Sequence, residues 1–139
     1  MVNYLKDFVN WFILKPNLDV KNLSLKIAER EIWRCSVGVN VGTEIDGKNS
    51  TNQIEKKLFT RPVLILKKLS QYSIIGIPLT RSSKIGTWYY PIKLKDENSS
   101  LLFSKIRMSD SRRFQRKIEK ISDSEFEKIK KKLIKFIQK

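Results

Sequence analysis

Histidine is absent from this chain of 139 residues, and Cys35 is its only cysteine. These absences exclude acid–base chemistry by imidazole, an internal disulfide and a cysteine-rich zinc site. Long apolar runs are also missing near the N-terminus, where residues 11–14 are too few for a signal-peptide core or a membrane span. We therefore expect a soluble, cytoplasmic protein that does not associate with membranes.

Acidic residues are scarce beside basic ones, because 14 Asp and Glu residues face 29 Lys and Arg residues and leave a formal net charge of +15. A surface of this charge repels itself, so we expect an anionic partner: nucleic acid, an anionic membrane or an acidic protein. The chain is 40% hydrophobic and long enough for one domain with its own core. Composition therefore favours a folded nucleic-acid binder.

A helix is predicted at each end of the chain. Apolar residues recur at helical spacing over residues 2–15 until Pro16, which predicts a short amphipathic helix, and a polar connector follows over residues 16–28. Near the C-terminus, Ser122 and Glu125 form a capping box. The apolar residues expected on one face of the first helix are Tyr4, Leu5, Phe8, Val9 and Phe12, and those of the last helix are Phe126, Ile129, Leu133, Ile134 and Ile137.

The chain between these helices has the pattern of short strands. From Glu31 onward, apolar and polar residues alternate as on a half-buried strand. Residues 38–59 have the composition of a long polar loop. Further strands are predicted over residues 62–66, 72–79, 87–94 and 101–108. Short strands separated by polar turns predict a mainly β fold, a small antiparallel β-barrel, with the helices added.

Five segments, in this order, resemble the MazF/PemK family of toxins. They are residues 30–33 (Arg-Glu-Ile-Trp), 40–44 (Asn-Val-Gly-Thr-Glu), 60–66 (Thr-Arg-Pro-Val-Leu-Ile-Leu), 77–80 (Ile-Pro-Leu-Thr) and 104–110, the last followed by Arg113 and Phe114. The resemblance covers about residues 29–137. It divides the chain into an N-terminal helical extension and connector, residues 1–28, and a MazF/PemK-like barrel domain, residues 29–139.

This resemblance implies a fold, an activity and two partners. The fold is a small SH3-like antiparallel β-barrel with a C-terminal helix, preceded here by the N-terminal helical extension. The activity is that of an mRNA interferase, a sequence-specific, metal-independent endoribonuclease that cuts single-stranded mRNA by attack of the RNA's own 2′-hydroxyl. An acidic antitoxin neutralises such toxins, which are usually homodimers. A basic chain of this charge suits an acidic antitoxin.

Two residues match the family's catalytic pair. Arg61 matches the catalytic arginine and stands at the start of a predicted buried strand, where packing fixes a guanidinium against a phosphate. We expect it to stabilise developing charge; a structural ion pair at a strand end is the alternative. Thr80 matches the catalytic threonine or serine, and the alternative for it is a β-forming residue that ends a strand.

Thr43 and Glu44 lie where related toxins place residues beside the scissile phosphate. Glu44 is expected to orient Arg61 or to accept a proton, and a solvated loop carboxylate is the alternative. Because histidine is absent and no carboxylates stand at metal-ligand spacing, we expect a site with no metal and no cofactor.

Basic and aromatic residues predict the rest of the RNA groove. In grooves for single strands, cations follow the phosphates and aromatic rings stack on the bases. Core packing is expected for at least one ring among Trp88, Tyr89 and Tyr90. The predicted RNA-binding residues are Thr43, Lys48, Arg81, Lys84, Trp88, Lys105 and Arg107.

Two other functions remain open from the sequence. A non-catalytic RNA-binding barrel keeps the positive charge but has no need of Arg61 and Thr80. A gyrase-poison toxin of the same fold acts through protein contacts of its C-terminal helix. A membrane-surface role for the lysine-rich terminal helix is a weaker third hypothesis.

Overall fold

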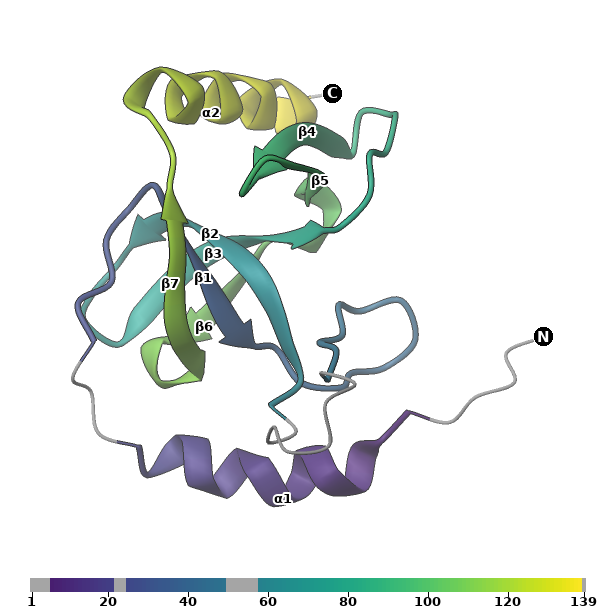
Figure 1. Cartoon of the computed structure of the whole chain (residues 1–139), viewed down its shortest axis with the longest axis vertical. Helices are drawn as coiled ribbons and strands as arrows, with labels where there is room; N and C mark the ends of the chain where they lie inside the picture. The colour runs from purple at the N-terminus through teal and green to yellow at the C-terminus, as the bar shows by residue number, and fades with distance from the viewer. Residues whose placement is uncertain (1–5, 22–24, 50–57, 139) are drawn as a thin grey trace.

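The computed structural model describes residues 6–21, 25–49 and 58–138. Within them the chain forms a curled antiparallel sheet and a helix near each end of the sequence (Figure 1). The helices are α1 (Phe8–Asp19) and α2 (Asp123–Gln138), with two short 3₁₀ helices, η1 (Phe103–Lys105) and η2 (Ser111–Arg113). The strands are β1 (Glu31–Ser36), β2 (Thr60–Lys68), β3 (Ser73–Thr80), β4 (Tyr89–Leu94), β5 (Glu97–Leu102), β6 (Arg107–Asp110) and β7 (Phe114–Lys120).

The strand order is β4-β5-β3-β2-β1-β7, and β6 pairs with β3. All pairings among these strands are antiparallel. The sheet curls into a half-barrel whose end strands are β4 and β7, and the two α-helices lie at opposite ends of it (Figure 1). The predicted fold class, a mainly β protein with a small antiparallel barrel and a C-terminal helix, is confirmed.

Strand β1 runs through the middle of the core. It lies between β2 and β7, and both of its faces are buried. Ile32 belongs to the apolar cluster that α2 completes, whereas Trp33 and Cys35 belong to a second cluster on the other face. The strand was predicted correctly, but the half-buried pattern was wrong, because even Ser36 is fully buried. Each large apolar side chain buried in these clusters stabilises the fold by roughly 1.5–3 kcal/mol.

Helix α2 confirms the serine half of the predicted capping box. The Ser122 hydroxyl accepts a hydrogen bond from the backbone N–H of Glu125 at 3.2 Å. The side chains that pack on the barrel are Phe126, Ile129, Leu133 and Phe136. Ile134 and Ile137 were wrongly expected on this face, since they are 53% and 67% exposed. Successive residues of a helix are rotated by about 100°, so the face that carries Leu133 turns Ile134 away.

Helix α1 differs from its prediction in its bounds. The pattern predicted a helix over residues 2–15 that stops at Pro16, but the helix continues through the proline to Asp19. Pro16 has no N–H to donate, yet its carbonyl still accepts from the Val20 N–H at 3.3 Å. Burial of Leu18, beyond the proline, holds this last turn against the barrel.

The packed face of α1 also differs from the predicted stripe. Trp11 and Leu18 are buried, and they form a third apolar cluster with Val39 and Phe59 of the barrel. The indole of Trp11 meets the Phe59 ring edge-on at 5.7 Å between centroids. Of the predicted stripe, Tyr4 and Leu5 lie outside the described residues, and the exposed members are Phe8, Val9 and Phe12.

A glycine allows α1 to dock this closely. Gly38 has φ +84°, and a Cβ added to it would lie 2.1 Å from a ring atom of Trp11. Only glycine adopts this backbone conformation without strain and also leaves room for the indole. Farther along, the Lys21 ammonium donates to the Phe114 carbonyl at 2.9 Å. The N-terminal segment is therefore packed directly onto the barrel.

The predicted strand over residues 101–108 was wrong in its bounds. Strand β5 ends at Leu102, η1 interrupts the chain, and β6 begins at Arg107. Strand β5 starts earlier, in a polar stretch, because the buried Ser100 hydroxyl is satisfied by the Ser82 carbonyl at 2.8 Å and the Lys84 N–H at 2.9 Å. Strand β7 was not predicted, since charged residues interrupt its apolar pattern.

Candidate functional site

The loop that follows β1 is held in shape by its own side chains. The Asn40 amide donates to the carbonyls of Val37 at 3.1 Å and Ile45 at 2.6 Å. The Asp46 carboxylate accepts from the Asn40 N–H at 2.7 Å. Gly47 then passes so close to Phe59 that a Cβ would lie 1.7 Å from the Phe59 carbonyl oxygen. The loop is thus tied both to itself and to the start of β2.

Arg61, near the start of β2, connects this loop to strand β3. Its Nε donates to the Asp46 carbonyl at 2.7 Å, and its Nη1 donates to the Leu79 carbonyl at 3.2 Å. Partial burial lowers the pKa of Arg61, and the Asp46 carboxylate acts in the opposite direction. The guanidinium remains charged at neutral pH. Its geometry is fixed by two backbone acceptors from two different segments.

Thr80 ends β3 and is partly buried. It pairs with Ser100 of β5, and it directly follows Leu79, whose carbonyl holds Arg61. The structure therefore brings the two residues predicted as a catalytic pair to the same place. The pairing with β5 fixes the backbone of Thr80 at this strand end.

Glu44 lines the same cleft as Arg61. Its carboxylate accepts a hydrogen bond from the Val41 N–H at 2.9 Å and thereby closes a turn. The described hydrogen bonds of Arg61 go instead to the backbone carbonyls of Asp46 and Leu79, and the nearby Asp46 carboxylate raises the pKa of the arginine against the larger effect of burial. Sequence reasoning missed Asp46, although Asp46-Gly47 is a dipeptide typical of tight turns.

Two of the predicted RNA-binding lysines meet the loop. The Lys105 ammonium donates to the carbonyl of Thr43. Lys48 forms an isolated β-bridge with Thr60, and its side chain is exposed at the cleft. The cleft has a volume of about 530 Å³ and is lined by Lys6, Asp7, Val39, Thr43, Glu44, Ile45, Asp46, Gly47, Lys48, Asn49, Phe59 and Arg61. Sequence reasoning also missed Lys6, because it is far in sequence from the other residues that line the cleft.

The other predicted RNA-binding residues are spread over two places. Arg81, Lys84 and Trp88 lie on the exposed loop between β3 and β4, and Trp88 is 57% exposed. Tyr89 and Tyr90 pack against the two core clusters, which confirms that at least one ring of this group belongs to the core. Arg107 lies in β6, near enough to Arg113 for the two charges to interact.

Arg113 links this basic group to helix α1. Burial and then the like charge of Arg107 lower the pKa of Arg113. Its guanidinium lies 5.4 Å from the centre of the Trp11 ring. Cys35 lies in the core beneath, and burial raises the pKa of its thiol to about 12. Cys35 therefore stays protonated at neutral pH and does not act as a thiolate nucleophile.

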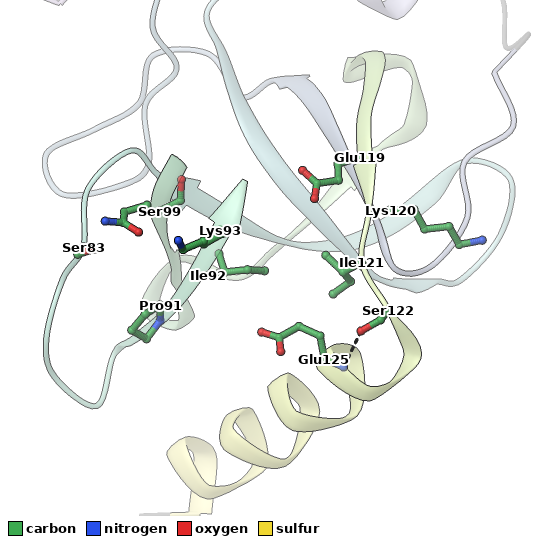
Figure 2. A pocket seen from close by; sticks show the side chains of 11 residues that line it. Ser83, Pro91, Ile92, Lys93, Ser99, Glu119, Lys120, Ile121, Ser122 and Glu125 are labelled. Atoms are coloured by element: carbon green, nitrogen blue, oxygen red, sulfur yellow. Dashed lines mark hydrogen bonds between the residues drawn. The ribbon is translucent and has the colours of Figure 1, made fainter. Parts of the chain in front are cut away.

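A second cleft has a volume of about 580 Å³. It lies between the two end strands of the sheet, with the β4–β5 hairpin on one side and β7 and the start of α2 on the other (Figure 2). Its charged residues include Lys93, Glu119 and Glu125. The site residues predicted from the sequence line the other cleft or lie elsewhere. Among the described residues, no group of three or more His, Cys, Asp or Glu side chains is placed to hold a metal ion. Neither described α-helix is long and apolar enough to span a membrane.

Two solved structures are similar to this chain in fold. The chain is similar in structure to an endoribonuclease in complex with its cognate antitoxin from a mycobacterial species, with 11% identity, a TM-score of 0.59, and coverage of 81% of this chain and 96% of that one. It is also similar to the Mycobacterium tuberculosis toxin MazF-mt6, with 15% identity, a TM-score of 0.51, and coverage of 58% and 88%. These likenesses show the fold.

The family assignment rests on the sequence. No curated protein matches the chain. The family model of PemK-like, MazF-like toxins of type II toxin-antitoxin systems matches residues 28–137, which is most of the chain. The chain therefore belongs to the PemK-like, MazF-like toxin family of type II toxin-antitoxin systems.

Proposed function

We propose that this chain is a metal-independent endoribonuclease toxin that cuts single-stranded mRNA at specific sequences. Membership of the toxin family supports the proposal in general. The observation that carries it is the placement of Arg61, which is tied to the Asp46 carbonyl at 2.7 Å and to the strand end that carries Thr80. A guanidinium fixed in this way is suited to a phosphate whose charge grows during the reaction.

The proposed reaction begins with attack of the RNA's 2′ oxygen on the adjacent phosphorus. This attack forms a 2′,3′-cyclic phosphate and breaks the bond to the 5′ oxygen, which takes a proton from solvent. We assign removal of the 2′-hydroxyl proton to Glu44, whose exposed carboxylate lines the cleft. Arg61 stabilises the charge that builds on the nonbridging oxygens, and Thr80 donates a hydrogen bond to one of them.

We assign RNA binding to exposed cations and one ring near this site. Lys48 lies at the cleft, and Arg81 and Lys84 lie with Trp88 on the loop before β4. The cations contact phosphates, and the exposed indole stacks on a base. The remaining assigned residues are Thr43 and Lys105, which are joined by a hydrogen bond, and Arg107 of β6.

An acidic antitoxin is the proposed protein partner. One similar solved structure is an endoribonuclease in complex with its cognate antitoxin. The net charge of +15 favours an acidic chain over other proteins. We further propose that the protein is cytoplasmic and forms a homodimer. We also propose that each chain consists of an N-terminal extension, residues 1–28, and a barrel domain, residues 29–139. The family match, which begins at residue 28, supports this division.

The test is to incubate the purified protein with a long single-stranded RNA in EDTA and to map the product ends. We expect site-specific cuts with cyclic-phosphate ends. Arg61→Ala and Thr80→Ala should each lower the cleavage rate by about a hundredfold or more. Arg116→Ala, which removes an exposed arginine of β7, is the matched control and should cut like the wild type.

Other outcomes would replace this function. RNA that is bound but stays whole would establish a non-catalytic RNA-binding module. Growth arrest that persists with Arg61→Ala, and disappears when α2 is altered, would establish a toxin that acts through protein contacts of its C-terminal helix.

A further inference from the structure

The N-terminal extension reaches the Arg61 cleft at Lys6 and Asp7, and Lys6 binds the loop over residues 40–46. Lys6 stands just before α1, which Trp11 anchors to the barrel. The Lys6 ammonium lies 2.9 Å from the Asp46 carboxylate. It also donates to the carbonyls of Asn40 at 2.7 Å and Gly42 at 3.1 Å. The family match begins only at residue 28, so this lysine comes from outside the matched region.

The three acceptors account for the whole hydrogen-bonding capacity of Lys6. A lysine ammonium has three N–H donors and no acceptor. Here all of them have partners, and the partners belong to one loop, residues 40–46. The Lys6 side chain is only 20% exposed. An ammonium whose three donors are all used in this way holds the loop in place and is not free to bind phosphate.

The loop that Lys6 binds, residues 40–46, also holds Arg61. Asp46 accepts Lys6 and the Asn40 N–H with its two carboxylate oxygens, and it accepts Arg61 Nε with its carbonyl. Removing Lys6 would leave one oxygen of a carboxylate that is 27% exposed without its cation. The position of the Asp46 carbonyl, and with it the guanidinium, would then be less well defined.

We propose that Lys6 is a positioning residue of the active site, supplied by the N-terminal extension: it fixes the loop over residues 40–46 and, through Asp46, the guanidinium of Arg61. This inference rests on the proposed ribonuclease function. Lys105 contacts the same loop at Thr43, so lysines from two distant parts of the chain hold it. The extension thus contributes a positioning residue to a site whose other residues belong to the barrel domain.

The experiment compares four variants of the full chain, Lys6→Gln, Lys6→Arg, Asp46→Asn and the double variant Lys6→Gln/Asp46→Asn, with the wild type. Lys131→Gln, which removes an exposed charge from α2, is the matched control. The substrate is an RNA oligonucleotide with one mapped cleavage site. The binding probe is the same oligonucleotide with a 2′-deoxy nucleotide at that site, which lacks the nucleophile.

We expect Lys6→Gln to lower kcat by about tenfold to a hundredfold with KM nearly unchanged, because misplacement of a catalytic group costs about this much. Lys6→Arg should recover most of kcat. The kcat of the double variant should be no lower than that of the less active single variant, Lys6→Gln or Asp46→Asn, since both substitutions break the same ion pair. The slope of log affinity against log salt should stay that of the wild type.

Three results would overturn the inference. If the wild type cuts and Lys6→Gln cuts equally well, Lys6 has no positioning role, while the proposed function stands. If Lys6→Gln instead raises KM, leaves kcat unchanged and lowers the salt slope by about 0.7, Lys6 is a phosphate ligand. An inactive wild type overturns the proposed function together with this inference. If Lys6→Gln fails to fold, Asp46→Asn breaks the same ion pair and decides the question.

Discussion

The two clefts have similar volumes, about 530 Å³ beside the start of α1 and about 580 Å³ beside α2, but their charged groups are held differently. In the first, Lys6 and Arg61 both contact Asp46, at 2.9 Å and 2.7 Å, and the three residues come from three separate segments. In the second, Glu119 accepts from the Lys95 N–H at 2.8 Å, and Lys93 is exposed.

The difference shows why size alone does not identify a site. Donors fixed by backbone acceptors stabilise a developing charge without having to reorganise, whereas an exposed ammonium is screened by solvent. Arg61 has such fixed geometry, because Asp46 and Leu79 hold its guanidinium from two sides. We therefore expect substitutions in the first cleft to change cleavage, and those in the second to have little effect.

The strongest expected effect comes from a change that keeps the charge and removes the geometry. Arg61→Lys should lower kcat by about a hundredfold or more, because a lysine is a point charge and cannot reach both carbonyls with a planar fork. Single-turnover cleavage in EDTA measures this. If Arg61→Lys cuts like the wild type, charge alone is sufficient, and the contrast between the clefts loses its main support.

The next largest effect on cleavage is expected from the Glu44 carboxylate. Glu44→Gln keeps the shape of the side chain and the acceptor oxygen for the Val41 N–H, but removes the proposed proton acceptor. We expect a loss of about a hundredfold in kcat, the usual contribution of a general base. Glu29→Gln, which changes another exposed glutamate, is the control. If the two variants behave alike, Glu44 is a turn-closing residue only.

Much of the barrel could be predicted from the sequence, because its signals are local. The capping box at Ser122 and the apolar run in β2 each specify their element from neighbouring residues. The two residues predicted as a catalytic pair also lie on adjacent strands, where Arg61 donates to the carbonyl of Leu79, the residue before Thr80. What could not be predicted depends on contacts between distant segments.

Helix α1 shows this limit most clearly. The apolar stripe predicted for it was the wrong face, and Trp11 packs instead because Phe59 and Gly38 of the barrel accommodate its indole. Lys6 and Asp46 escaped prediction for the same reason: they are 40 positions apart, and only the docking of α1 brings them together.

A smaller effect is expected from the residue that allows this docking. Gly38→Ala should lower the free energy of unfolding by about 2 kcal/mol, because its Cβ would meet the Trp11 ring at 2.1 Å. Gly42→Ala is the control: its φ is also positive, +55°, but nothing lies within 4 Å of the added Cβ. It should cost only about 1 kcal/mol. Equal losses in chemical denaturation would show that backbone strain alone acts at Gly38.

The smallest effect is expected in the second cleft, and it tests the comparison directly. Lys48 and Lys93 are both exposed lysines that line a cleft, one in each. If RNA follows the Arg61 cleft, Lys48→Gln should reduce the salt slope of binding by about 0.7, the amount for one phosphate contact on a single strand. Lys93→Gln should leave the slope and the cleavage rate unchanged, although both variants lose the same charge. An equal decrease in both would mean that the RNA responds to the total charge of +15, and that the geometry around Arg61 does not determine where it binds.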